Sequence, residues 1–222
     1  KMAVSSAIER GVAPIGPVKN LVVMVRFANH TDRTFPSTSD VDVLFNKVGG
    51  DPVLAPTGSI RDVYLQNSYG QMELNSDVQA WVTVSNTEAY YANGASGDQT
   101  LWQALREALT QLDGTVDFSD YDSDGDGKID AIAFLHSGYG AEWGGTDVDG
   151  TGQDDRIWSH RWAMQSSAWT SEEGITVDDY HISPALWDTS GSDIGRIGVI
   201  AHETGLFFGL PDLYDSNGGG AG

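Results

Sequence analysis

Two short, strongly apolar runs constrain what this chain can fold into more than any other feature. Residues 21–27 read Leu-Val-Val-Met-Val-Arg-Phe, and residues 129–135 read Ile-Asp-Ala-Ile-Ala-Phe-Leu. Runs of this length, rich in β-branched residues, are typical of buried strands. Because the 222 residues include no cysteine, no disulfide can hold such strands in place.

Helical patterns alternate with these strands along the chain. Residues 100–112 carry an apolar stripe with helical spacing, and residues 58–67 are typical of a shorter helix. Residues 194–208 have the length and apolar content of a buried helix. Residues 72–84 alternate in polarity, which predicts a hairpin or one long strand.

We expect two further short strands, at residues 157–160 and 177–182. Strands that alternate with helices predict an α+β fold with an α/β-like mixed twisted sheet. The length suits one domain spanning residues 1–222. None of the apolar runs approaches the roughly 18 residues that a membrane-spanning helix needs.

The charge balance excludes some partners. The formal net charge is -20, and 24 of the 32 acidic residues are Asp. A chain this negative is repelled by nucleic acid and by anionic membranes, so neither is an expected partner. Asp is a weak helix former but a good calcium ligand, which leaves two interpretations, general solubility and calcium binding.

An Asp-rich loop at residues 122–130 favours calcium. Its ligand positions, at alternate residues, are Asp122, Asp124, Asp126, Lys128 and Asp130. This is the spacing of an EF-hand-type loop, in which the seventh position needs only a backbone carbonyl and therefore accepts Lys. Position twelve holds Ala133 instead of the usual Glu, and a strand is expected next, so the loop is predicted to be a structural calcium site. A looser acidic group could form a second calcium site or a plain solvated loop: Asp147, Asp149, Asp154 and Asp155.

A metallopeptidase-like motif lies near the end of the chain. In an H-E-x-x-H helix two histidines one turn apart bind zinc, and the glutamate acts as general base on the zinc-bound water. His202, Glu203 and Asp212 occupy the positions of the first ligand, the base and the third ligand, and Gly209 occupies the turn between them. Leu206 occupies the second-ligand position.

The sequence around this motif resembles the immune inhibitor A family of secreted bacterial metallopeptidases. The family run His-Glu-x-Gly-His-x-x-Gly-Leu-Pro-Asp-Leu-Tyr-Asp matches residues 202–215 at every fixed position except the second His. Similar stretches occur at residues 58–70, 121–130 and 157–161. The resemblance therefore covers nearly the whole chain.

The resemblance implies a zincin- or metzincin-like catalytic domain, with an N-terminal subdomain and an active-site helix. It also implies Zn²⁺ and Ca²⁺ as cofactors, and secretion as a zymogen with an upstream signal sequence and propeptide. A C-terminal subdomain that completes the cleft is expected after the zinc motif and is missing from this chain. Expected partners are protein or peptide substrates, and the chain's own C-terminal fragment.

Leucine offers no lone pair, so zinc would keep only His202 and Asp212 from the motif. Three explanations stay open. One His-to-Leu change inactivated a peptidase; or the chain is a naturally decayed pseudopeptidase; or a substitute ligand, such as His160, His181 or a residue outside this chain, completes the site. Three functions also stay open: a calcium-stabilised secreted endopeptidase inactive as written, a calcium-stabilised binding or adhesion module, and a nicked half of an active enzyme.

Overall fold

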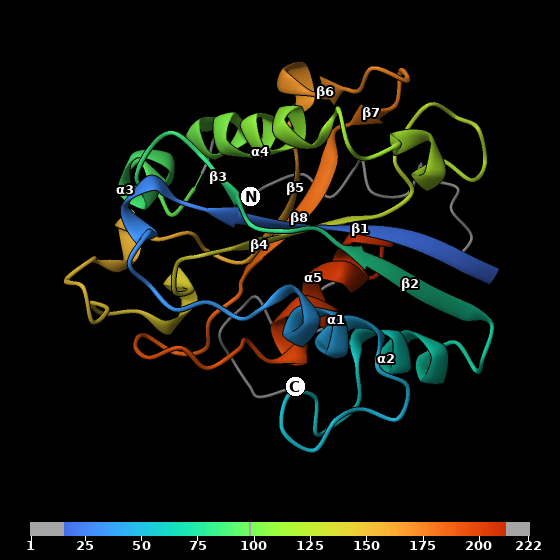
Figure 1. The fold of residues 1–222 in the computed structure, drawn as a ribbon, viewed down its shortest axis with the longest axis horizontal. Coiled ribbons are helices and arrows are strands. Elements are labelled where there is room, and N and C mark those ends of the chain that lie inside the picture. The colour runs from blue at the N-terminus through green and yellow to red at the C-terminus, as the bar shows by residue number, and fades with distance from the viewer. Residues whose placement is uncertain (1–15, 98, 212–222) are drawn as a thin grey trace.

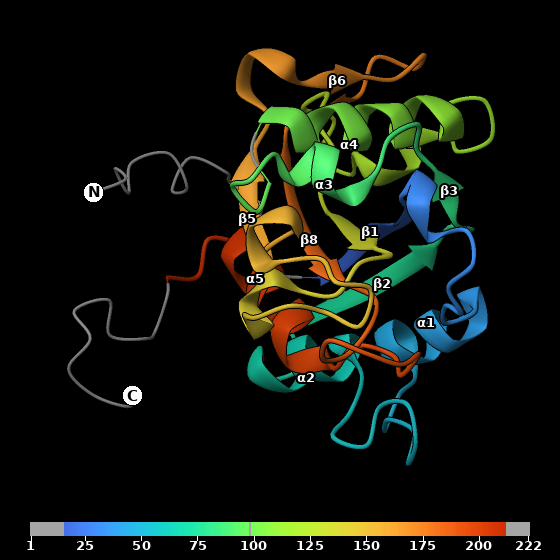
Figure 2. The same ribbon diagram turned by 90° about the vertical axis from the view of Figure 1, so that its left-hand side faces the viewer.

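The computed structural model describes residues 16–97 and 99–211, which form a central sheet with helices on both faces (Figures 1 and 2). In chain order the elements are β1 (Gly16–Arg26), η1 (Ala28–His30), α1 (Thr38–Asn46), α2 (Ile60–Asn67), β2 (Met72–Val78), β3 (Val82–Thr83), α3 (Glu88–Ala92), α4 (Gln99–Leu112), η2 (Phe118–Tyr121), β4 (Ile132–His136), η3 (Ala141–Trp143), η4 (Gln153–Asp155), β5 (His160–Ala163), η5 (Gln165–Ser167), β6 (Trp169–Thr170), β7 (Thr176–Val177), β8 (Asp179–Pro184) and α5 (Ile197–Phe207).

The main sheet is mixed but mostly parallel. Its strand order is β2-β1-β4-β8-β5. The short strand β3 pairs with β1 on the same side as β2, beyond the end of β2. The pairs β1–β2, β1–β3, β1–β4 and β4–β8 are parallel, whereas β5 runs antiparallel to β8. The mixed sheet expected from the sequence is thus confirmed, and the antiparallel strand lies at its edge.

Strand β1 is an interior strand of the sheet, between β2 and β4. Its first residues alternate between buried and exposed, and residues 20–25 are then buried without interruption. A strand covered on both faces has no solvent side, which explains the continuous apolar run in the sequence. Strand β4 is buried along its whole length for the same reason.

The helices form two layers. Helices α3 and α4 cover one face, and the β6–β7 hairpin lies outside α4 (Figure 1). Helices α1, α2 and α5 cover the other face, where α1 and α2 contact β2 and α5 contacts β8 and β5 (Figure 2). In the described part of the chain, no helix has the length and apolar character needed to cross a bilayer.

Most predicted elements are present, with three corrections. Residues 72–84 form no hairpin, because β2 and β3 lie one after the other along β1 and both run parallel to it. Residues 157–160 are mostly irregular, since β5 begins only at His160. Helix α1, absent from the sequence prediction, begins with a capping box in which Ser37 and Asp40 bond each other's backbone amides.

The apolar composition of helix α5 predicts a helix that is buried on every side. Only one side of α5 is buried in the structure. Ile200, Glu203, Thr204 and Phe207 are buried, whereas His202 is exposed and Leu206 is half-buried on the other side. Just before the helix, a Cβ atom on Gly195 would lie 2.9 Å from the backbone oxygen of Pro184. The absence of a side chain at residue 195 therefore lets the start of α5 approach the end of β8.

This contact predicts opposite effects of alanine at two neighbouring glycines. Gly195→Ala is expected to lower the free energy of unfolding by about 1–3 kcal/mol, because backbone atoms have to move apart. Gly198→Ala is the control. A Cβ there meets nothing within 4 Å, and alanine favours helix by up to about 1 kcal/mol. Urea denaturation of both variants checks the prediction, and equal stabilities would contradict it.

Candidate functional site

The motif residues lie on α5 as the helical repeat requires. His202 and Leu206 are one turn apart on the exposed face, while Glu203 is buried beside them at 6% exposure. Asp212, the predicted third ligand, lies outside the described residues. The described part of the helix thus presents one imidazole and one hydrocarbon side chain to the position of a zinc ion, so these residues do not fit catalytic zinc.

Neither substitute ligand named above is placed to complete the site. His160 uses both ring nitrogens, Nδ1 at 2.7 Å from the Trp158 carbonyl oxygen and Nε2 at 3.0 Å from the Tyr180 hydroxyl. His181 is 1% exposed and lies under the helix, with Nε2 3.2 Å from the Thr204 hydroxyl. Thr204 is on the face of α5 opposite His202, so His181 lies away from the exposed face of the helix.

Two contacts from outside the helix fix α5 around residues 201–205. The Tyr64 hydroxyl on α2 donates to the carbonyl oxygen of Ala201 at 2.6 Å. Burial raises the pKa of Tyr64 above its ordinary value, so the hydroxyl keeps its proton.

From the sheet side, Thr204 ties α5 to β8. Its hydroxyl donates to the Ile200 carbonyl at 2.7 Å, so His181 Nε2 carries the proton that it shares with Thr204. Burial lowers the pKa of His181 to about 3, which keeps the ring neutral. The helix is therefore hydrogen-bonded to α2 and to β8 on either side of Glu203.

The Asp-rich loop brings together three of its five predicted ligands. Carboxylate oxygens of Asp122, Asp124 and Asp130 lie within 4.8 Å of one another, and this is the one such group of His, Cys, Asp or Glu within residues 16–97 and 99–211. Asp126 is not part of the group, and its Oδ1 accepts the amide proton of Lys128 at 2.8 Å. The Lys128 side chain offers no acceptor, and its backbone forms a bridge with Thr176 of β7.

The second acidic group does not gather into a cation site. Asp149 forms an ion pair with Arg33, and Asp147 lies 3.6 Å from the same guanidinium. Asp154 and Asp155 are exposed in η4. Arg33, from the loop after β1, therefore offsets part of the charge of the first two carboxylates.

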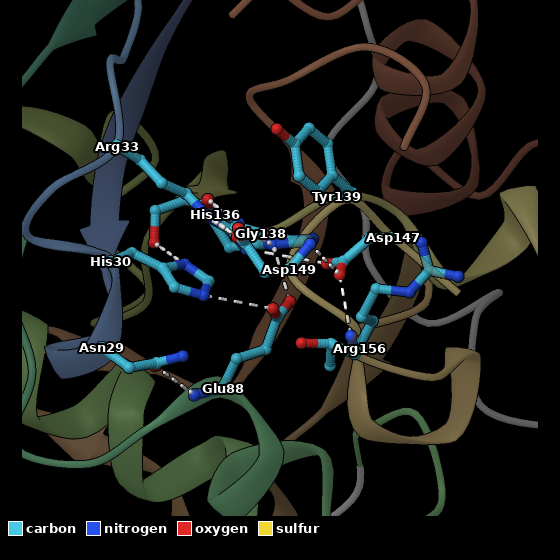
Figure 3. A network of polar contacts seen from close by, with 12 residues as sticks. Asn29, His30, Arg33, Glu88, His136, Gly138, Tyr139, Asp147, Asp149 and Arg156 are labelled. Carbon is cyan, nitrogen blue, oxygen red and sulfur yellow. Dashed lines mark hydrogen bonds and ion pairs between the residues drawn. The ribbon is translucent and has the colours of Figure 1, made fainter. Parts of the chain in front are cut away.

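Sequence reasoning missed a buried polar cluster next to this ion pair (Figure 3). Glu88 is 1% exposed, and its carboxylate oxygens face His30 Nε2 at 3.5 Å and His136 Nδ1 at 3.8 Å. From the sequence, His136 and His30 are predicted to be ordinary structural or surface histidines. The position of His136 at the end of a buried strand was the one available signal, and nothing in the sequence links residues 30, 88 and 136.

The chain is similar to known metallopeptidases. The family profile described as immune inhibitor A peptidase M6, catalytic domain, matches residues 41–222. Immune inhibitor A of Bacillus thuringiensis subsp. alesti is 31% identical over 211 residues, covering 78% of this chain and 28% of that protein. Pre-pro-metalloprotease PrtV of Vibrio cholerae serotype O1 is 30% identical over 215 residues, covering 86% of this chain and 22% of that protein. The chain thus spans about a quarter of each relative.

The contact between Tyr64 and α5 predicts a local effect of removing one hydroxyl. Tyr64→Phe is expected to lower stability by about 1 kcal/mol and to speed amide exchange in α5, since Ala201 loses a donor. Tyr91→Phe is the matched control, because the Tyr91 hydroxyl is also hydrogen-bonded, to Glu107 and to Asn86. All three residues lie far from α5 in the sequence. Exchange mass spectrometry of both variants decides, and equal α5 exchange would contradict the assignment.

Proposed function

Because the chain belongs to the immune inhibitor A family of M6 peptidases, we propose that it has the fold of a secreted zinc endopeptidase and is inactive as written. The observation that carries this proposal is the pair His202 and Leu206 on the exposed face of α5, next to the buried Glu203. One of the side chains at the expected metal site is therefore a hydrocarbon, while the helix still has its hydrogen bonds to α2 and β8.

The finer points of the proposal follow from the family. The chain is the N-terminal subdomain and active-site helix of a zincin-like catalytic domain, made as a zymogen and exported. The name of PrtV, a pre-pro-metalloprotease, supports that processing. Its substrates are proteins or peptides, and a C-terminal subdomain, which the family relatives are long enough to contain, completes the cleft.

A second candidate function is a binding or adhesion module on the same fold. The poor fit of the described α5 residues to zinc favours it, because a binder needs no metal ligand at residue 206. The two candidates differ in what restoring one histidine does. A peptidase inactivated by one change regains chemistry, whereas a module shaped for binding does not.

Leu206→His is expected to bind one zinc per chain and to gain caseinolytic activity, because two imidazoles one turn apart then face one ion. The unaltered chain is expected to bind no stoichiometric zinc. Metal analysis and a casein assay on both proteins make the test. Adding Glu203→Gln to the restored variant is the control, which should keep zinc and lose activity about 10²–10⁴-fold. Stoichiometric zinc in the unaltered chain would contradict the proposal.

We also propose that Asp122, Asp124 and Asp130 hold a structural Ca²⁺, with Asp126 and the Lys128 carbonyl as the remaining predicted ligands. Three carboxylates so close repel one another without a cation, and the net charge of -20 adds to this repulsion. The loop is tied to β7, since the amide of Ile129 donates to the Thr176 carbonyl at 3.1 Å. Calcium would therefore stabilise the β6–β7 hairpin together with the loop.

Chelation is expected to lower the melting temperature, and calcium at 100 times its Kd to stabilise the fold by about 2.7 kcal/mol. Asp124→Asn should lose most of this calcium-dependent gain, because one charged ligand is removed. Asp154→Asn is the control, since that exposed carboxylate lies outside the group. Thermal melts with calcium and with EDTA provide the measurement, and a melting temperature that EDTA leaves unchanged would refute the calcium site.

A further inference from the structure

Residues 147–155 have the same residue pattern as the Asp-rich loop at residues 122–130. Both segments read Asp-x-Asp-Gly-x-Gly and carry a further Asp at the ninth position. In both, the backbone amide at position five donates to the carboxylate at position one, at 3.0 Å in the first loop and at 2.8 Å in the second. The second segment is therefore also a loop of the calcium-binding type.

The two loops differ in what faces their carboxylates. In residues 122–130 three Asp carboxylates face one another. In residues 147–155 the first two carboxylates face the guanidinium of Arg33, which comes from the loop after β1 (Figure 3). Asp155, at the ninth position, is exposed in η4. A side chain of the protein itself therefore supplies the positive charge in the second loop.

The groups around Arg33 are the kind of ligand that calcium prefers. Nε of Arg33 donates to Asp149 Oδ2 at 2.9 Å, and Nη2 donates to the same oxygen. Nη1 donates to the Ser137 carbonyl at 3.1 Å, and Nη2 lies 3.6 Å from Asp147 Oδ2. Two carboxylates and one backbone carbonyl thus face one cationic group, and carboxylates and carbonyls are the oxygen ligands typical of a calcium site.

The burial of Asp147 makes a cation at this point necessary. Its side chain is fully buried, and its Oδ2, which faces Arg33, has no hydrogen-bond partner among the described residues. A carboxylate buried in this way is strongly destabilising unless a positive charge lies close to it. The guanidinium also lies over the ring of Tyr139, with Cζ 4.8 Å from the ring centroid, which adds a cation–π contact.

An ordinary surface ion pair accounts for only part of these contacts. Asp149 is half exposed, and taken alone its pair with Arg33 would contribute little to stability. The buried Asp147 and the calcium-type pattern of the loop are left unexplained by such a pair. Both are explained if the guanidinium has the role that a metal ion has in loops of this type.

The second loop holds the segment that leads into α5. The amide of Val148 donates to the Thr189 carbonyl at 2.9 Å, and the Tyr139 hydroxyl donates to the Gly191 carbonyl at 2.8 Å. Residues 189 and 191 belong to the connection between β8 and α5. The charge that orders the loop therefore also fixes the approach to the helix that carries His202.

We propose that residues 147–155 form a calcium-type loop in which the Arg33 guanidinium takes the place of the metal ion. The loop is then ordered at any calcium concentration, and so is the entry to α5. This inference does not depend on calcium binding at residues 122–130, since it concerns a separate set of carboxylates. Its direct consequence is that removal of the guanidinium turns the second loop into a Ca²⁺ site.

The test removes the guanidinium and asks whether Ca²⁺ replaces it. Arg33→Ala is made in an Asp124→Asn background, so that the first loop does not add a calcium response of its own. In EDTA, hydrogen exchange of residues 144–152 is expected to be faster than in the Asp124→Asn parent. About 10 mM Ca²⁺ should slow it again about 10- to 100-fold, because a loop with two carboxylates is expected to bind with a Kd of about 10⁻⁴–10⁻³ M.

Arg161→Ala in the same background is the matched control. Arg161 also pairs with an aspartate, Asp179, and its side chain is 16% exposed against 12% for Arg33. That pair lies outside any Asp-x-Asp-Gly loop, so the exchange that Arg161→Ala speeds should not respond to Ca²⁺. A Ca²⁺ response of equal size in both variants would mean general screening of the net charge of -20, and it would overturn the proposal.

Two other results would also overturn it. One is exchange of residues 144–152 in Arg33→Ala that is the same with Ca²⁺ and with EDTA, which would leave Arg33 as an ion-pair partner alone. The other is a Ca²⁺-induced shift of the Gly150 and Gly152 amide signals in the unaltered chain, because Arg33 should already fill the site. If Arg33→Ala does not fold, Arg33→Gln takes its place, since it removes the charge but keeps most of the side chain, and the same Ca²⁺ response is expected. Slowing by Ca²⁺ that is confined to the Arg33 variants would establish the proposal.

Discussion

The burial of β1 on both faces is the constraint on which the other elements depend. A strand with no solvent side needs a neighbour at each edge and a layer above and below. Strands β2 and β3 supply one edge and β4 the other, while α4 contacts it from one face. Because β1, β4 and β8 run in the same direction, their carboxyl ends meet on one side of the sheet. His30, Glu88, His136 and Ser137 lie at that side.

The shared direction of these strands explains why polar groups crowd together at one end of a mostly apolar core. Loops that follow parallel strands converge, so His30 and Arg33 after β1 meet His136 and Ser137 at the end of β4. Buried polar groups are tolerated only when hydrogen-bonded or paired. Here Arg33 pairs with Asp149 and lies 3.6 Å from the buried Asp147, and the buried Glu88 carboxyl lies between two imidazoles.

The sequence predicts local features well and long-range ones poorly. The strand at residues 21–27 follows from its apolar run, and the shared face of His202 and Leu206 follows from the helical repeat. The parallel course of residues 72–84 beside β1 does not follow, since alternation in polarity gives burial but not strand direction. His30, Glu88 and His136 meet because three separate segments of the chain come together at one edge of the sheet. No spacing of residues in the sequence predicts this.

The contacts that hold α5 explain how the fold persists with leucine at residue 206. The helix is fixed through Tyr64 at Ala201 and through His181 at Thr204, and its buried face is completed by Ile200 and Phe207. Leu206 belongs to none of these contacts, because it lies on the other face. A ligand position on an exposed helix face can therefore change without loss of packing, so chemistry and stability are separable at this residue.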